Sequence, residues 1–310
     1  MRVATIDLGT NTVRLLVAEV EPAARAWRVI DHDQRVTRLG EGSRAAGRLL
    51  EGPAARTTTS VVDYVERARR AGATRLEIVA TSAVREADNG AAFARELAGA
   101  TGVPVRVISG DDEARLTLRG ILDGLGPVPG TMLAFDIGGG STEFMLARDG
   151  ALIATVSLRL GVVPLAERYR LTEADADTEY GALEEDVSRQ LARELAAPIV
   201  GVPIAHLVGS AGTVTTLAAL DLELRLYDAA RVQGHVLTRA AIERQRARLA
   251  ALDVAGRAAL PCLEPGRADL ILPGVAIVMA TLARVGCDRL TVSDSGLREG
   301  IMAEIVAGAI

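Results

Sequence analysis

The sequence contains no lysine, although it is 310 residues long and its 35 basic residues are all arginine. This absence excludes mechanisms that depend on a lysine, such as those of P-loop NTPases and protein kinases. Contacts to an anion must therefore come from arginine, backbone N–H groups or hydroxyls.

Cysteine and long apolar runs are also scarce. Cys262 and Cys287 are the only cysteines and form no Cys-x-x-Cys motif, which argues against a disulfide framework and against a zinc site. No apolar run approaches the length of a membrane span, and residues 270–282 are interrupted by Pro273, so we expect a buried helix there. Because a strand containing Asp7 starts the chain, we expect no signal peptide and a cytoplasmic location.

The charge balance narrows the class of partner. The net charge of −5 argues against a nucleic-acid-binding protein, whose surface is normally basic. Apolar residues make up 49% of the chain and charged residues 24%, as in ordinary globular proteins. At this length the chain can hold two domains, each with its own core.

Two glycine-rich turns, each preceded by an aspartate at the end of an apolar run, lie far apart in the chain. They are Asp7-Leu8-Gly9-Thr10-Asn11-Thr12 and Asp136-Ile137-Gly138-Gly139-Gly140-Ser141-Thr142. Apolar residues follow both turns, so each is predicted to join two strands. Convergent backbone N–H groups and hydroxyls at such turns suit phosphate, and each aspartate is a natural ligand for magnesium. An ordinary hairpin turn is the alternative for the first loop.

The two turns indicate an internal duplication. Asp136 follows Asp7 at an offset of 129 residues (136 − 7), and three predicted strands accompany each aspartate. The segment 124–130, which is rich in glycine and proline, separates the two copies. We therefore predict domains over residues 1–123 and 124–310, with the closing helix, residues 297–310, as a candidate to pack back on the first domain.

Several further motifs occur in a fixed order along the chain. They are IDLGTNTVRL (6–15), ATSAVREADNGAAF (80–93), ISGDDEARL (108–116), FDIGGGSTE (135–143), GSAGT (209–213), LPG (272–274) and VSDSGLREGI (292–301). This ordered set resembles the exopolyphosphatase/guanosine pentaphosphate phosphatase family of the actin-like ATPase superfold. The resemblance implies an α/β fold of two ribonuclease-H-like (actin-like ATPase) domains. Each would contain a mixed five-stranded sheet with flanking helices, and the active site would lie in the interdomain cleft.

Three acidic residues are the candidate catalytic groups. In the related enzymes the last acid of the motif at 108–116 is the proposed base that activates water, and Glu113 matches it. For the neighbouring Asp111 and Asp112, complementing the helix dipole is a sufficient explanation. Glu143 lies two residues after Ser141 and, with Asp136, can hold magnesium or the attacking water; an outward-facing strand glutamate is the alternative. One carboxylate within reach of the water is sufficient for phosphoanhydride hydrolysis.

The remaining site residues are predicted to bind phosphate. Arg85 matches a family arginine, and its planar guanidinium suits a phosphate group. The segment 209–213 precedes a predicted helix, so anion binding and a plain helix cap both explain it. Arg298 also matches a family arginine, and we interpret it as a structural hinge residue. The phosphate-binding residues are predicted to be Gly9, Thr10, Asn11, Arg85, Gly138, Gly139, Gly140, Ser141, Thr142, Gly209, Ser210, Gly212 and Thr213, with Asp7, Asp136 and Glu143 as metal ligands.

The resemblance implies an exopolyphosphatase that depends on Mg²⁺, or on Mn²⁺ in its place, and releases terminal phosphate from inorganic polyphosphate. Hydrolysis of guanosine pentaphosphate (pppGpp) is the alternative, because both substrates present a terminal phosphoanhydride. A kinase of the same superfold and a non-catalytic sensor of polyphosphate or alarmone are hypotheses from other classes. Relatives commonly form homodimers, so we expect one here, with no membrane and no nucleic-acid partner.

Overall fold

The computed structural model describes all residues except 25, 174–176, 196–198, 200 and 309–310, and it divides into two compact units. Unit 1 comprises Met1–Asp123 and Leu297–Ile310, and unit 2 comprises Gly124–Gly296. The chain therefore leaves unit 1 once and returns to it with its closing helix.

The described residues of unit 1 form a mixed five-stranded sheet in the order β3-β2-β1-β4-β5. Its strands are β1 (Arg2–Leu8), β2 (Thr12–Glu21), β3 (Ala26–Val36), β4 (Arg75–Ala80) and β5 (Val105–Val107). The first three strands form an antiparallel meander, whereas β4 and β5 continue the sheet in parallel with β1. Parallel neighbours need crossover connections, which the intervening helices supply.

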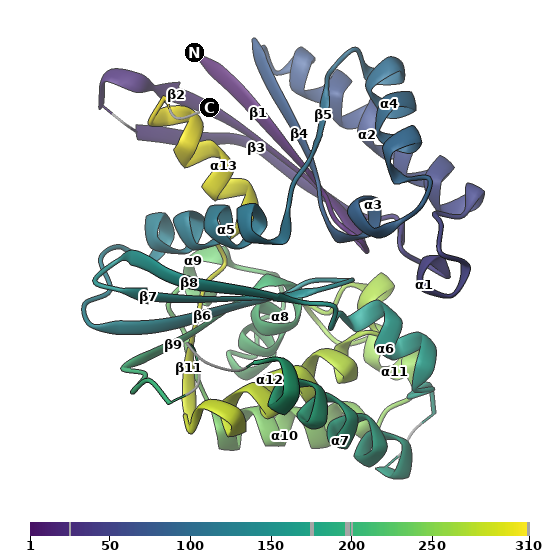
Figure 1. Cartoon of the computed structure of the whole chain (residues 1–310), viewed down its shortest axis with the longest axis vertical. Helices are drawn as coiled ribbons and strands as arrows, with labels where there is room; N and C mark the ends of the chain where they lie inside the picture. Colours follow the sequence, from purple (N-terminus) through teal and green to yellow (C-terminus); the bar gives the residue numbers. More distant parts are fainter. Residues whose placement is uncertain (25, 174–176, 196–198, 200, 309–310) are drawn as a thin grey trace. The chain divides into compact units, whose positions relative to one another are not determined.

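Helices cover both faces of this sheet (Figure 1). α2 (Glu51–Arg70) and α4 (Gly90–Thr101) pack on the face that contains Ile6, and α5 (Gly110–Leu125) and α13 (Leu297–Val306) pack on the face that contains Val3. Alternate residues of β1 enter these two cores, as the two-residue period of a strand requires. The shorter elements of the unit are η1 (Pro22–Ala24), α1 (Ser43–Ala46) and α3 (Ser82–Glu86).

A glycine sets the close approach of α13 to α5. A Cβ atom at Gly300 would lie 1.8 Å from the backbone oxygen of Leu116 and 3.1 Å from the backbone nitrogen of Gly120. Only glycine fits at such a distance, so Gly300 lets the closing helix pack directly on the backbone of α5.

The described residues of unit 2 form a six-stranded mixed sheet in the order β10-β11-β9-β6-β7-β8. The strands are β6 (Thr131–Ile137), β7 (Thr142–Arg148), β8 (Ala151–Leu158), β9 (His206–Ser210), β10 (Val236–Thr238) and β11 (Arg289–Val292). β6, β7 and β8 repeat the antiparallel meander of unit 1, and β9 and β11 continue in parallel. β10 pairs antiparallel with β11.

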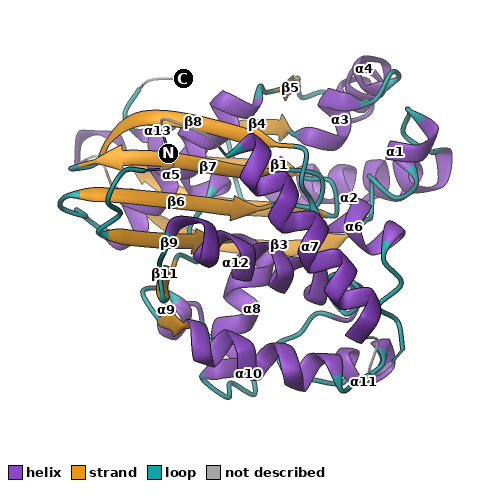
Figure 2. Cartoon of the chain, turned by 60° about the horizontal axis from the view of Figure 1, so that its bottom comes forward, coloured by secondary structure: helices purple, strands orange, loops and turns teal. Residues whose placement is uncertain are grey.

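One face of this sheet contributes Leu133, Phe135 and Phe144 to a core shared with several helices, including α7 and α12 (Figure 2). On the other face, Asp136 and Glu143 lie at the turn end of β6 and β7, and Met132, Ala134, Met145 and Ala147 follow along the same two strands. The helices of the unit are α6 (Val162–Arg168), α7 (Asp177–Glu194), α8 (Ala211–Asp221), α9 (Ala229–Val232), α10 (Arg239–Ala250), α11 (Val254–Ala258), η2 (Pro265–Arg267) and α12 (Ile271–Val285).

Two details differ from the sequence predictions, although the predicted fold class is confirmed. The second sheet contains the extra edge strand β10, which is only three residues long and ends at Thr238, whose hydroxyl accepts the N–H of Ala241 at the start of α10. The sequence also predicts a helix over residues 172–195; in the structure this helix is α7, which begins at Asp177, and residues 174–176 lie outside the described residues.

The helix predicted over residues 270–282 is α12, and Ile271 to Leu282 are buried. In the described part of the chain, no helix has both the length and the apolar character needed to cross a membrane.

Candidate functional site

The first glycine-rich turn connects β1 to β2. The N–H of Gly9 donates to the oxygen of Thr12 over 3.1 Å, and a Cβ atom at Gly9 would lie 3.0 Å from that same oxygen. The segment after β3 braces the turn, because Gly40 donates to the oxygen of Thr10 and both Thr37 and Arg38 donate to the oxygen of Asn11. These bonds engage the carbonyls of the turn, so an anion would meet its amide and hydroxyl donors.

The second turn, between β6 and β7, has the same construction. Gly138 donates to the oxygen of Ser141 over 2.9 Å, at the same offset of 129 residues (138 − 9). Here the segment after β8 braces the turn. Val162 donates to the oxygen of Gly138, and Val163 donates to the oxygen of Gly139. In the opposite direction, the hydroxyl of Thr142 donates to the oxygen of Leu160 in this segment. The predicted duplication therefore extends to the hydrogen bonds of both turns and to the place in the chain from which each is braced.

Gly161 determines how closely the brace approaches the second turn. A Cβ atom there would lie 2.3 Å from the oxygen of Gly139 and from the carbonyl carbon of Gly140. Sequence reasoning missed this residue, which lies after the end of β8 and outside both glycine-rich turns.

The aspartates that precede the two turns have different cross-strand neighbours. Asp7 pairs in register with Arg14, and Arg14 Nη1 lies 3.8 Å from Asp7 Oδ2. Asp136 pairs in register with Glu143, which is 1% exposed. Opposite charges therefore face each other in unit 1, and two carboxylates face each other at the equivalent place in unit 2.

Glu113 and Arg85 are brought together in unit 1. Arg85, on α3, donates through Nη1 to Glu113 Oε2 and to the backbone oxygen of Ile108, each over 2.9 Å. Side-chain exposure is 22% for Arg85 and 12% for Glu113, so the pair is largely shielded. The arginine thus fixes both the start of α5 and the carboxylate predicted to activate water.

Asp112, which neighbours Glu113, is hydrogen-bonded to Ser109, the residue that precedes α5 and caps it. The hydroxyl of Ser109 accepts the N–H of Asp112 and donates to its carboxylate. Asp112 also lies 3.8 Å from Arg115 and is 52% exposed, which agrees with its assignment to the helix terminus rather than to chemistry.

The segment 209–213 forms the end of β9 and the start of α8. Ser210 Oγ donates to Asp136 Oδ2 over 2.6 Å, which links this segment to the second turn. A Cβ atom at Gly212 would lie 2.2 Å from Nη1 of Arg267, and a Cβ atom at Gly274 would lie 2.1 Å from Oγ1 of Thr213. The absence of a side chain at Gly212 leaves room for the guanidinium of Arg267, and its absence at Gly274 leaves room for the side chain of Thr213.

Arg267 is a second residue that sequence reasoning missed. Its guanidinium lies over Gly212 and is held by Glu264, whose Oε2 is 3.2 Å from Nε. It lies outside the sequence motifs given above, and the fold of η2 brings it to this helix terminus.

Arg298 lies on α13 in unit 1. It donates through Nη1 to the backbone oxygen of Leu15 over 3.3 Å and pairs through Nη2 with Glu299 over 3.0 Å. The bond to Leu15 joins the closing helix to β2, the strand that follows the first turn, whereas the ion pair with Glu299 lies within α13.

The donor set near the second turn fits a magnesium ion better than that near the first. Mg²⁺ is usually held by one or two carboxylates together with substrate phosphates, and Asp136 and Glu143 supply such a pair. Arg14 compensates the charge of Asp7, which makes Asp7 a weaker candidate ligand. Within the described residues, no group of three or more His, Cys, Asp or Glu side chains is arranged to hold a metal. Mg²⁺ held by two carboxylates completes its coordination with water and substrate phosphate.

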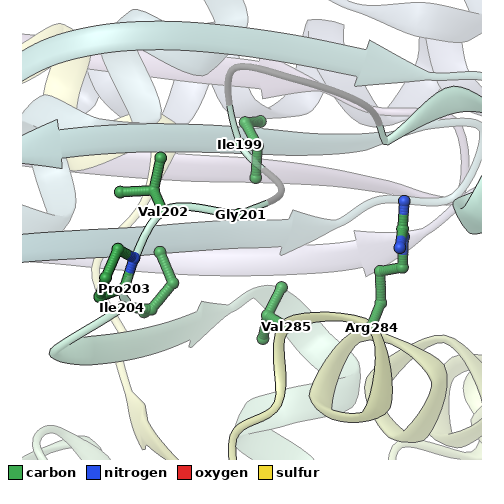
Figure 3. A pocket seen from close by; sticks show the side chains of 7 residues that line it. All are labelled: Ile199, Gly201, Val202, Pro203, Ile204, Arg284 and Val285. Atoms are coloured by element: carbon green, nitrogen blue, oxygen red, sulfur yellow. The ribbon is translucent and has the colours of Figure 1, made fainter.

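A separate hollow of about 260 Å³ lies in unit 2 beside the start of β9, at the opposite end of that strand from Ser210. Figure 3 shows its lining, which is apolar apart from Arg284. Arg284 donates to the oxygen of Leu195 near the end of α7. None of the predicted site residues lines this hollow.

The two-unit fold and the two equivalent glycine-rich turns define a protein of the actin-like ATPase superfold. The chain belongs to the Ppx/GppA phosphatase family, whose profile matches residues 16–308. Membership places it among the hydrolases of the phosphatase class.

Particular relatives cover almost the whole chain. Exopolyphosphatase 2 of Mycobacterium tuberculosis is 37% identical, over 97% of this chain and 97% of the relative. The crystal structure of the Aquifex aeolicus member of the Ppx/GppA family is 31% identical, with a TM-score of 0.82, and covers 100% of this chain and 98% of that one. An exopolyphosphatase structure from Cytophaga hutchinsonii has a TM-score of 0.91 at 23% identity, covers 99% of this chain and 98% of that one, and supports the fold alone.

Proposed function

We propose that this protein is an exopolyphosphatase that releases terminal orthophosphate from inorganic polyphosphate. The observation that carries the proposal is the 37% identity to an exopolyphosphatase along nearly the full length of both chains. The two braced turns support it, since each offers amide and hydroxyl donors that suit phosphoryl oxygens.

In the proposed reaction, Glu113 orients a water molecule and accepts its proton as the water oxygen attacks the terminal phosphorus. The bond from that phosphorus to the bridging oxygen breaks, and the shortened chain keeps the bridging oxygen. Arg85 holds Glu113 in place, as its 2.9 Å hydrogen bond to the carboxylate indicates. The donors of the turns stabilise the charge on the phosphoryl oxygens.

Magnesium bound by Asp136 and Glu143 would neutralise charge on the phosphoryl oxygens. Both residues lie on strands rather than on loops, and a serine hydroxyl hydrogen-bonds each of them. This support keeps the carboxylates in one orientation before the substrate arrives, which reduces the reorganisation that binding requires.

Guanosine pentaphosphate is the second candidate substrate, because the chain belongs to the Ppx/GppA phosphatase family and the sequence resemblance includes guanosine pentaphosphate phosphatases. It presents the same terminal phosphoanhydride to the same donors. Homodimer formation, expected from the resemblance, stays a prediction.

One assay separates these functions: phosphate release from short polyphosphate, long polyphosphate and guanosine pentaphosphate, measured side by side with Mg²⁺ and with Mn²⁺. We expect release from polyphosphate to be the most efficient, as judged by kcat/KM. Faster release from guanosine pentaphosphate would overturn the substrate assignment. Tight binding without release from any substrate would instead identify a non-catalytic sensor.

A further inference from the structure

Four polar side chains form a row across the sheet of unit 2. Ser210 on β9 is in register with Asp136 on β6, Asp136 with Glu143 on β7, and Glu143 with Ser157 on β8. Because residues in register lie side by side on one face of a sheet, the row reads serine, aspartate, glutamate, serine.

The two outer serines both donate inward to the carboxylates. Ser210 Oγ is 2.6 Å from Asp136 Oδ2, and Ser157 Oγ is 2.8 Å from Glu143 Oε1. Hydrogen bonds from a hydroxyl to a charged carboxylate are short and strong, so each serine fixes the rotation of its carboxylate. Glu143 is 1% exposed, and a buried carboxylate needs such donors.

The equivalent row of unit 1 shows that the fold does not require these serines. At the same register positions unit 1 has Val79, Asp7, Arg14 and Gln34. The same meander and the same turn are therefore built with neither serine and with only one carboxylate. The two hydroxyls occur only in the unit that has the carboxylate pair, which indicates that their role is to hydrogen-bond the carboxylates rather than to build the sheet.

We propose that Ser157 and Ser210 are positioning residues that orient Glu143 and Asp136 toward a divalent cation. Each hydroxyl donates a hydrogen bond from the neighbouring strand to one oxygen of its carboxylate and so restricts the rotation of that carboxylate. Residues of this kind hold metal ligands in the geometry the ion needs, and their loss typically weakens metal binding about 10- to 100-fold. Ser157 provides the cleaner test, because Ser210 also belongs to the segment at the start of α8.

The test compares Ser157→Ala with Ser157→Thr in the full chain. Mn²⁺ binding is titrated by electron paramagnetic resonance in the presence of inorganic phosphate, and the Mg²⁺ concentration for half-maximal phosphate release is measured in parallel. We expect Ser157→Ala to raise both values about 10- to 100-fold, while KM for polyphosphate at saturating Mg²⁺ stays close to that of the wild type. Ser157→Thr keeps the hydroxyl on a strand that accepts threonine, and we expect it to restore most of the affinity.

Unchanged metal affinity in Ser157→Ala would overturn the proposal, as would an equal loss in the alanine and threonine variants. A wild-type protein that binds no Mn²⁺ would overturn it too. The inference rests on the proposed function for its metal site, but the two can fail separately. Mn²⁺ binding that depends on Ser157 in a protein that releases no phosphate would refute the exopolyphosphatase assignment and still support the positioning role.

Discussion

Glu113 and Asp112 are adjacent acids in the first turn of α5, and their surroundings differ. Arg85 holds Glu113, whereas Asp112 is exposed and bonded to the capping Ser109. We expect Glu113→Gln to abolish measurable phosphate release while substrate affinity stays nearly unchanged, because the amide keeps the shape but cannot accept the proton. Single-turnover phosphate release and equilibrium polyphosphate binding measure the two effects.

Asp112→Asn is the matched control for Glu113→Gln. It removes an acid one residue away, and we expect near-normal turnover from it. If the glutamine variant still released phosphate at close to the normal rate, Glu113 would have no part in activating water.

Gly161 provides a second test at the residue scale. Its substitution by alanine would place a Cβ atom 2.3 Å from the backbone of Gly139 and Gly140, so the turn must shift. Since a displacement of about 1 Å at a binding site can lower a rate by on the order of 100-fold, we expect Gly161→Ala to lose about that much kcat/KM.

Gly181→Ala is the control for that variant. Gly181 lies inside α7, and a Cβ atom there would meet nothing within 4 Å. We expect normal activity and a stability gain of up to about 1 kcal/mol, because alanine favours a helix. Equal activity in both variants would show that the turn tolerates the added methyl group.

How much of the site the sequence could predict depends on how local the signal is. The two turns, Asp136 and Glu143 are encoded within one hairpin each, so spacing alone placed them on adjacent strands. Ser157 faces Glu143 because the register of the β7–β8 hairpin shifts between Leu146 and Ala147, and Arg267 takes its place by lying against Gly212 at the start of α8. No local pattern distinguishes such residues from ordinary polar ones.

At the scale of elements, strand β3 is held at the edge of its sheet by charged contacts to α2. Arg67 donates to both carboxylate oxygens of Asp31 over 2.6 Å and to Asp33 over 2.7 Å. Arg35 pairs with Asp63 over 2.6 Å, and its guanidinium lies 4.9 Å from the ring centroid of Tyr64. Because an edge strand has a partner on one side only, these contacts supply part of what a second strand would.

This attachment predicts a dependence of stability on pH. The hydrogen bonds from Arg67 hold the pKa of Asp31 below its ordinary value. A carboxyl whose pKa is lowered by folding stabilises the folded state above its unfolded pKa of about 3.9, and that stabilisation is lost as the pH falls through the folded value. We therefore expect Asp31→Asn to be less stable than the wild type at neutral pH. As the pH falls below about 4, we expect the free energy of unfolding to decrease less in the variant than in the wild type.

Urea unfolding between neutral pH and pH 3 would measure the effect. Glu66→Gln is the control, since Glu66 is 59% exposed and lies 3.5 Å from Arg70 on the surface of α2, where an ion pair contributes little. A pH profile of Asp31→Asn that parallels the wild type would show that this contact does not contribute.

Element prediction from sequence succeeded where the apolar pattern was strong and failed where it was short. The closing helix, predicted over residues 297–310, spans Leu297–Val306 in the structure, where residues 309–310 are not described, and each glycine-rich turn joins two strands as predicted. β10 contains only three residues and α1 only four, so neither shows a period that sequence reasoning can detect.

At the scale of the whole molecule, unit 1 is completed by a helix that the chain delivers only after unit 2. α13 contributes Ile301, Met302 and Ile305 to the core that also contains Leu116 of α5. Gly300→Ala would force a Cβ atom to within 1.8 Å of the oxygen of Leu116, and we expect a loss of about 1–3 kcal/mol in the stability of unit 1.

Hydrogen exchange resolved by segment would locate that loss. We expect faster exchange in β1, β2 and α5 and unchanged exchange in β6, β7 and β9. Gly99→Ala, at a position of α4 where a Cβ atom meets nothing within 4 Å, should accelerate exchange in neither unit, because alanine favours a helix. Uniform acceleration in both units would show instead that the molecule unfolds as a single cooperative block.

The equivalence of Arg14 and Glu143 has a consequence for how such a protein can evolve. Both occupy the same register position opposite the aspartate of their turn, at an offset of 129 residues (143 − 14). Backbone turn, strand pairing and brace are common to both copies, so a duplicated hairpin inherits its architecture complete. Selection then needs to act on very few codons to give one copy an arginine beside its aspartate and the other a second carboxylate.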